Sequence, residues 1–104
     1  MLVYPEKPVP QIAWATMDFF KQIKGRTILK IETNMVQFSS PQGLVDANPN
    51  QMILAPAFMS GTIACQKVLG GIAGINYALE FLLSYTDGTN SSEEGLVRVV
   101  KFRT

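Results

Sequence analysis

The segment from Asn76 to Tyr85 constrains the fold of this chain more than any other part of the sequence. Every second residue in it is large and apolar: Tyr77, Leu79, Phe81, Leu83 and Tyr85. Successive side chains of a β-strand point to opposite faces, so this spacing places all of them on one face. Such a face needs a second layer to cover it. The segment therefore predicts a strand in a layered β protein.

Other apolar, β-branched segments lie between turn residues and are typical of strands. We expect strands over residues 12–18, 27–38, 51–54, 62–69 and 95–103. The residues Phe19 to Lys24 favour one helical turn that ends at Gly25, where glycine commonly closes a helix. With at least five strands separated by turns, the simplest architecture is an all-β sandwich.

Two glycine-containing turns flank the alternating strand. Before it, Gly70, Gly71 and Gly74 predict a tight corner that needs positive φ or close backbone approach. After it, Asp87 and Gly88 predict the turn of a hairpin with a long tip. The glycines lack the lysine and serine or threonine of a phosphate-binding loop, so we assign them a structural role.

The N-terminal segment has a different composition from the rest. Pro5, Pro8 and Pro10 fix φ and remove backbone donors, so residues 1–11 favour an extended arm or an edge strand. Residues 12–104 show no linker or repeat and are expected to form a single domain. The first residues have no basic head followed by an apolar run, so they do not read as a signal peptide.

Composition argues against several classes of function. The chain has no histidine and one cysteine, which removes the usual proton shuttle and the commonest zinc ligand, and we expect no catalytic residues, metal or cofactor. A net charge of +1 gives no basic field for nucleic acid. From Thr33 to Thr86 the only charged residues are Asp46, Lys67 and Glu80. We expect this charge-poor span to lie between layers or under another molecule.

Three alternatives remain open at this stage. The apolar stretch from residue 63 to 83, with glycines in GxxxG spacing, has the length of a membrane helix, although its alternation favours strands. The oxygen-bearing side chains between Asp87 and Glu94 could hold calcium or form a solvated tip. Trp14, Phe19 and Phe20 could form an aromatic binding surface, but we expect them to fill the core.

The glycine corner also carries a family resemblance. The stretch Leu69-Gly70-Gly71-Ile72-Ala73-Gly74-Ile75-Asn76-Tyr77, with the alternating strand, the Thr-Asp-Gly turn and a valine-rich last strand, resembles small immunoglobulin-like structural proteins of tailed bacteriophages. Met17-Asp18-Phe19 before Gly25-Arg26-Thr27-Ile28 is similar to the first strand of that family and its entry into the second. The resemblance implies an immunoglobulin-like or fibronectin III-like β-sandwich.

The same resemblance implies a non-enzymatic virion protein, assembled in the host cytoplasm: a head decoration, neck or adaptor subunit. Its partners would be capsid, portal, neck or tail proteins and further copies of itself, with no nucleic acid or membrane partner. The candidate interface residues are Tyr4, Val9, Met52, Ile53, Phe58 and Met59. The alternative function is a carbohydrate- or receptor-binding module of a phage tail or fibre, in which Trp14 or the hairpin tip contacts the ligand.

Overall fold

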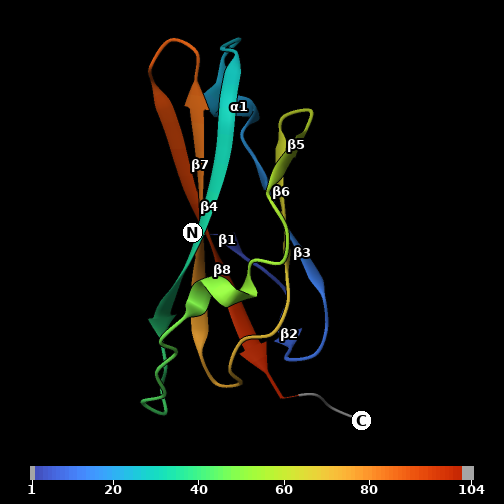
Figure 1. Ribbon diagram of the computed structural model, residues 1–104, viewed down its shortest axis with the longest axis vertical. Coiled ribbons are helices and arrows are strands. Elements are labelled where there is room, and N and C mark those ends of the chain that lie inside the picture. The colour runs from blue at the N-terminus through green and yellow to red at the C-terminus, as the bar shows by residue number, and fades with distance from the viewer. Residues whose placement is uncertain (1, 102–104) are drawn as a thin grey trace.

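A computed structural model of the chain describes residues 2–101 and consists mainly of β-strands (Figure 1). The elements are β1 Leu2–Val3, β2 Lys7–Pro8, β3 Ala13–Asp18, α1 Phe20–Ile23, β4 Ile28–Ser39, the 3₁₀-helix η1 Pro49–Met52, β5 Phe58–Ser60, β6 Ile63–Val68, β7 Asn76–Tyr85 and β8 Asn90–Val100. They form an elongated body of 45 × 25 × 21 Å. The prediction of an all-β sandwich agrees with this arrangement.

The strands form two sheets that lie side by side in Figure 1. The larger sheet has the order β1-β8-β7-β4, with β2 also paired to β8, and the smaller sheet has the order β3-β6-β5. All pairings are antiparallel except those of β1 and β2 with β8, which are parallel. The chain changes sheet after β2, β3, β4 and β6, so the strands enclose one interior between the two layers.

The alternating strand β7 supplies the centre of this interior, as its pattern predicted. Its large residues are almost completely buried: Tyr77, Leu79, Phe81, Leu83 and Tyr85. The small sheet turns Ala15, Met17 and Ala64 inward, and these residues belong to the same buried cluster. The large side chains of β7 thus meet mainly smaller ones from the small sheet, and the two layers fill one core.

Two expectations about the strands were wrong. Residues 51–54 do not form a strand, because η1 occupies Pro49–Met52 and only Ile53 makes an isolated bridge, to Val68. Proline is favoured at the first position of a helix, which explains the start at Pro49. The hairpin tip is also short, since β8 begins at Asn90 and its first residues, through Glu94, continue the ladder with β7.

The N-terminal segment is not a free arm. Leu2 and Val3 pair with Gly95 and Leu96, and Lys7 and Pro8 pair with Val99 and Val100 of the same chain. The expectation of an edge strand therefore describes residues 2–8 better than that of an extended arm. This segment covers one edge of the larger sheet, while β4 remains its outermost strand on the other side.

Residues 63–83 are β6, the glycine corner and β7, so they do not form a membrane helix. Between residues 2 and 101, the structure contains no helix with the length and apolar character that a membrane crossing needs.

Candidate interaction surface

The outward face of the small sheet exposes large apolar side chains. Along β3, Ala15 and Met17 point into the core, so the alternation directs Trp14 and Thr16 outward. Trp14 is 53% exposed and Phe58 on β5 is 48% exposed. Exposed tryptophan on a regular strand is unusual, because burial of its ring gives a large hydrophobic gain. The residues that line this surface, named the aromatic face below, are Trp14, Phe58, Ile63, Cys65 and Lys67.

The two aromatic rings on this face hold a defined geometry. The ring centroids of Trp14 and Phe58 lie 5.7 Å apart with an interplanar angle of 79°, an edge-to-face contact. Lys67 pairs with Trp14 across the β3–β6 ladder, and its Nζ lies 5.6 Å from the Trp14 ring centroid. Both neighbours contact the indole and restrict its rotation.

The structure corrects the expectation that Trp14, Phe19 and Phe20 fill the core. Phe19 is fully buried, whereas Trp14 is on the outer face of β3 and Phe20 is 70% exposed at the start of α1. The sequence contained a signal that Trp14 points outward. Thr16 and Asp18 share its face of the strand, and polar residues at every second position indicate a solvent-facing side.

The six predicted interface residues do not form one surface. Met52 is 2% exposed and belongs to the core, so its side chain is closed to a partner in this conformation. Four more of the six are partly buried and pack against the core: Tyr4, Val9, Ile53 and Met59. Only Phe58 is strongly exposed, and it lies on the aromatic face.

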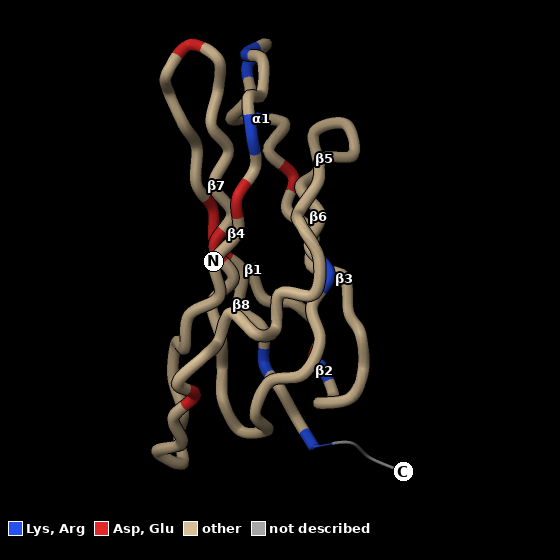
Figure 2. Tube along the Cα trace, viewed as in Figure 1, with Lys and Arg blue, Asp and Glu red and all other residues tan. Residues whose placement is uncertain are grey.

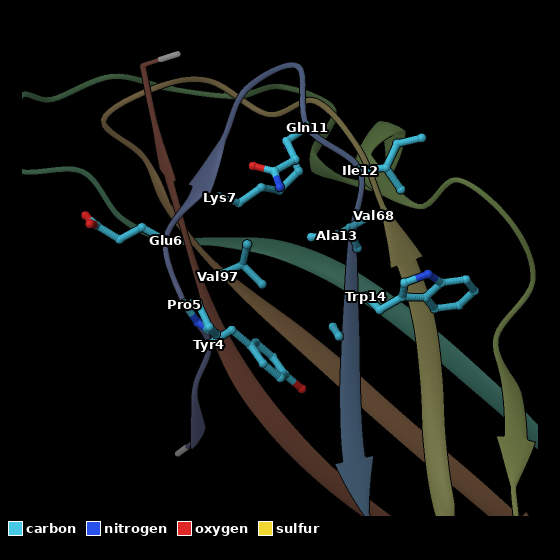
Figure 3. Close-up of a pocket in the computed structure, with 11 residues that line it drawn as sticks. Tyr4, Pro5, Glu6, Lys7, Gln11, Ile12, Ala13, Trp14, Val68 and Val97 are labelled. Atoms are coloured by element: carbon cyan, nitrogen blue, oxygen red, sulfur yellow. The ribbon is translucent and has the colours of Figure 1, made fainter. Parts of the chain in front are cut away.

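A shallow cavity of about 190 Å³ lies between the N-terminal segment and β3 (Figure 3). Tyr4, Glu6 and Gln11 line one side, and Trp14 lies on the other (Figure 3). The Tyr4 hydroxyl donates to the carbonyl oxygen of Thr16 at 2.9 Å, and burial raises the pKa of Tyr4 to about 12. Tyr4 therefore connects the N-terminal segment to the small sheet.

Lys7 holds the same segment in place from the inside. Its side chain is almost fully buried, and its Nζ donates to the carbonyl oxygens of Pro8, Val9 and Gly70 at 3.0, 3.0 and 2.8 Å. Burial lowers its pKa from the ordinary value for lysine. Sequence analysis missed this residue, because nothing near Pro5 and Pro8 indicates that a lysine between them is buried.

A second buried polar group joins the two sheets. Gln66 on β6 accepts a hydrogen bond from Thr33 Oγ1 at 2.6 Å and donates from Nε2 to the carbonyl oxygens of Ala55 and Lys67 at 2.6 and 2.9 Å. All its amide atoms are satisfied, so its burial carries no orphan-group penalty. The alternation of β6 could have identified Gln66, because it lies on the same face of the strand as the buried residues Ala64 and Val68.

The glycine corner has the conformation that its sequence predicted. Gly70, Gly71 and Gly74 have φ values of +79°, +94° and +94°. At the end of this corner, Tyr77 Oη accepts the backbone N–H of Ile72 at 2.9 Å and donates to Asp46 Oδ2 at 2.8 Å. Burial, followed by the bond to Asp46, raises the pKa of Tyr77 to about 12. The corner, the loop around Asp46 and the core are thus joined at one hydroxyl.

The hairpin turn uses its carboxylate for its own geometry. Gly88 has a φ of +87°, as predicted, and Asp87 Oδ1 accepts both the backbone N–H and the hydroxyl of Thr89. These bonds lower the pKa of Asp87. Within residues 2–101 no three His, Cys, Asp or Glu side chains gather in a way that could hold a metal ion.

Comparison with known proteins adds no assignment: no protein-family model matches this chain, and no curated protein is significantly similar to it.

Proposed function

We propose that this chain is a non-enzymatic structural subunit that packs against other protein chains in a multi-copy assembly. The observation that carries the proposal is the exposed Trp14–Phe58 pair on an ordered sheet face. Ordered apolar surface on a small domain commonly marks a protein interface, and aromatic residues are enriched in the strongest contacts.

Covering the aromatic face would contribute a substantial hydrophobic free energy to association with a partner. Covering the exposed half of a tryptophan removes roughly 100 Å² of apolar area from water, on the order of 2–3 kcal/mol gross at about 25 cal/mol per Å². Repetition around a symmetric ring or shell multiplies such contacts, so modest pairwise affinity suffices for stable assembly.

The charge-poor span supports the same reading. Seven of its large apolar side chains are exposed: Phe38, Leu44, Val45, Leu54, Phe58, Ile63 and Ile72. Figure 2 shows that the tube from the second half of β4 to the end of β6 is almost free of charged positions. Few charges and many exposed apolar groups favour coverage by another protein over free solvent.

Two features favour the immunoglobulin-like type of sandwich within the β class. The strand order, three strands β3-β6-β5 against β8-β7-β4 with an N-terminal strand parallel to the last one, fits the two-sheet arrangement of that type. Tyr77, near the start of β7, bonds to the backbone of Ile72 in the preceding corner, in the manner of a tyrosine corner.

The virion assignment rests on the sequence resemblance between Leu69 and Gly88. In this proposal the chain serves as a head decoration, neck or adaptor subunit of a tailed phage. The glycine corner and the hairpin, which carry the resemblance, have the predicted turn conformations.

The test is incorporation into particles. Virions produced with the native gene, Trp14→Ala, Phe58→Ala or Thr16→Ala would be purified, and the chain quantified by mass spectrometry against the major capsid protein. Thr16 is exposed on the same outer face of β3 and serves as the matched control. We expect a fixed copy number for the native and Thr16→Ala chains and at least about tenfold less for the aromatic variants. A chain absent from particles, or Trp14→Ala incorporated at the native level, would contradict the proposal.

Carbohydrate binding is the second candidate, favoured by the half-exposed Trp14 beside the cavity. A glycan array separates the two. Glycan binding that disappears in Trp14→Ala, with incorporation unchanged, would support this candidate over packing.

A further inference from the structure

The strand β4 leaves one edge of the larger sheet without a partner strand. It is outermost in the order β1-β8-β7-β4, whereas the N-terminal segment covers the opposite edge. The lower part of β4 is in contact with η1, but no strand among residues 2–101 pairs with the part around Ile31. Unpaired backbone groups on such an edge can accept a further strand.

Two hydrogen bonds identify which residues present these groups. The backbone N–H of Met35 donates to Asn50 Oδ1 at 2.7 Å, so Met35 directs its backbone groups away from β7. The backbone N–H of Thr86, just after β7, donates to the carbonyl oxygen of Thr27 at 3.0 Å. The even-numbered residues of β7 therefore direct their backbone N–H and C=O groups toward β4. Backbone direction alternates along a strand, so Ile31 and Thr33 also direct their N–H and C=O groups outward.

The charges beside Ile31 have opposite signs. Lys30 and Glu32 lie on the outer face of the sheet, with side chains 60% and 55% exposed, and form an ion pair of 3.2 Å. Figure 2 shows the basic and acidic positions following one another along β4. An antiparallel two-fold pairing centred between them would place each charge opposite its complement.

We propose that two copies of this chain join through β4, antiparallel, with the two-fold axis at Ile31. In this register the two Ile31 residues exchange both backbone hydrogen bonds. Lys30 lies opposite Glu32 of the second copy, and Glu32 opposite Lys30 of the second copy. Leu29, which is 65% exposed in the bulge, lies next to the end of this pairing. The result is one continuous sheet across both copies.

The charges select this register over its neighbours. A shift of two residues in either direction sets Lys30 against Lys30 or Glu32 against Glu32, and like charges directly opposite are destabilising. A larger shift toward Met35 meets the N–H that Asn50 already holds. The bulge between Ile28 and Lys30 confines regular pairing to the residues from Lys30 onward in any register. Charged residues and bulges restrict edge pairing in general. Here they leave one register open.

The inference deepens the proposed function by naming one partner, a second copy, and it uses residues outside the aromatic face. The two can therefore fail separately: loss of particle incorporation in Trp14→Ala with a monomeric native chain would retain the packing function and reject the β4 dimer.

Charge reversal tests the pairing on the intact chain by analytical ultracentrifugation from micromolar to millimolar concentration. We expect a reversible dimer for the native chain. Lys30→Glu and Glu32→Lys should each weaken it about tenfold, because two attractive pairs become repulsive. The double variant Lys30→Glu/Glu32→Lys should restore it. Lys101→Glu, an exposed change of the same size, is the control. A monomeric native chain, or no recovery in the double variant, would overturn the proposal.

Cross-linking tests the register separately. In a Cys65→Ser background, Ile31→Cys places a thiol beside the two-fold axis, whereas Asn34→Cys does not lie opposite itself in this register. We expect oxidation to link Ile31→Cys into dimers several times faster than Asn34→Cys. Equal rates would reject the register.

Discussion

Replacing Gly71 by alanine should destabilise the fold far more than the same change at the adjacent Gly70. Both residues have positive φ, +94° and +79°, so alanine costs about 1 kcal/mol at either position for the left-handed backbone. Only at Gly71 is the added Cβ obstructed: it would lie 2.8 Å from Val99 Cγ2 and 3.1 Å from Met52 Cε. At Gly70 nothing lies within 4 Å.

The difference in unfolding free energy between Gly71→Ala and Gly70→Ala isolates the cost of the overlap with Val99 and Met52. Val99 is a β-branched residue in β8 and cannot move easily, so the overlap adds about 1–3 kcal/mol. We therefore expect a loss of about 1 kcal/mol for Gly70→Ala and about 2–4 kcal/mol for Gly71→Ala. Urea titration followed by circular dichroism measures both. Since 1 kcal/mol corresponds to about 4–8 °C in Tm for a domain of this size, thermal melting gives a second measure. Equal losses in the two variants would refute the contact with Val99.

Further predictions concern the buried hydroxyls and the N-terminal segment. Tyr77→Phe removes the acceptor of the Ile72 N–H and the donor to Asp46, and should cost about 1–3 kcal/mol in urea unfolding; a loss no larger than that of Tyr85→Phe, whose hydroxyl contacts Ser91, would contradict this. The pKa of Tyr77 is raised to about 12 in the folded state, so its contribution is complete below the ordinary tyrosine pKa of 10.0 and is lost as pH rises from there toward 12. The native chain should therefore lose more stability than Tyr77→Phe over that interval, and parallel pH profiles would reject the assignment. Gly95→Ala builds a Cβ that overlaps the Tyr4 ring and should release the N-terminal segment, measured as faster amide exchange at Tyr4 and Val9 with β7 unchanged.

Strand positions could be predicted where the sequence alternates and is bounded by turn residues. β7 ends at Tyr85 as expected, because its apolar period continues without interruption to the Asp87–Gly88 turn. η1 could have been inferred from Pro49, a favoured first helical residue, but the apolar Met52 and Ile53 resembled a short strand. Short apolar runs do not distinguish the two by themselves.

The surface was harder to predict than the core. The residue type of Trp14 predicts burial, although its face is fixed by the register of β3 against β6 and by the space that β7 fills. The open edge at Ile31 had no sequence signal, since strand order in a sheet depends on pairings between distant residues. Residue type indicates how much a side chain gains from burial, while topology decides whether space exists for it.

The parallel pairing of the N-terminal segment with β8 also sets an order of folding. Leu2 pairs with Gly95 and Val3 with Leu96. β1 is synthesised before β8, so it has no pairing partner until β8 leaves the ribosome. During that interval Tyr4 and Lys7 lack the residues of β8 with which they pair in the folded chain. Closure of the sandwich then becomes a late event, and newly made chains should become resistant to protease only after β8 has emerged.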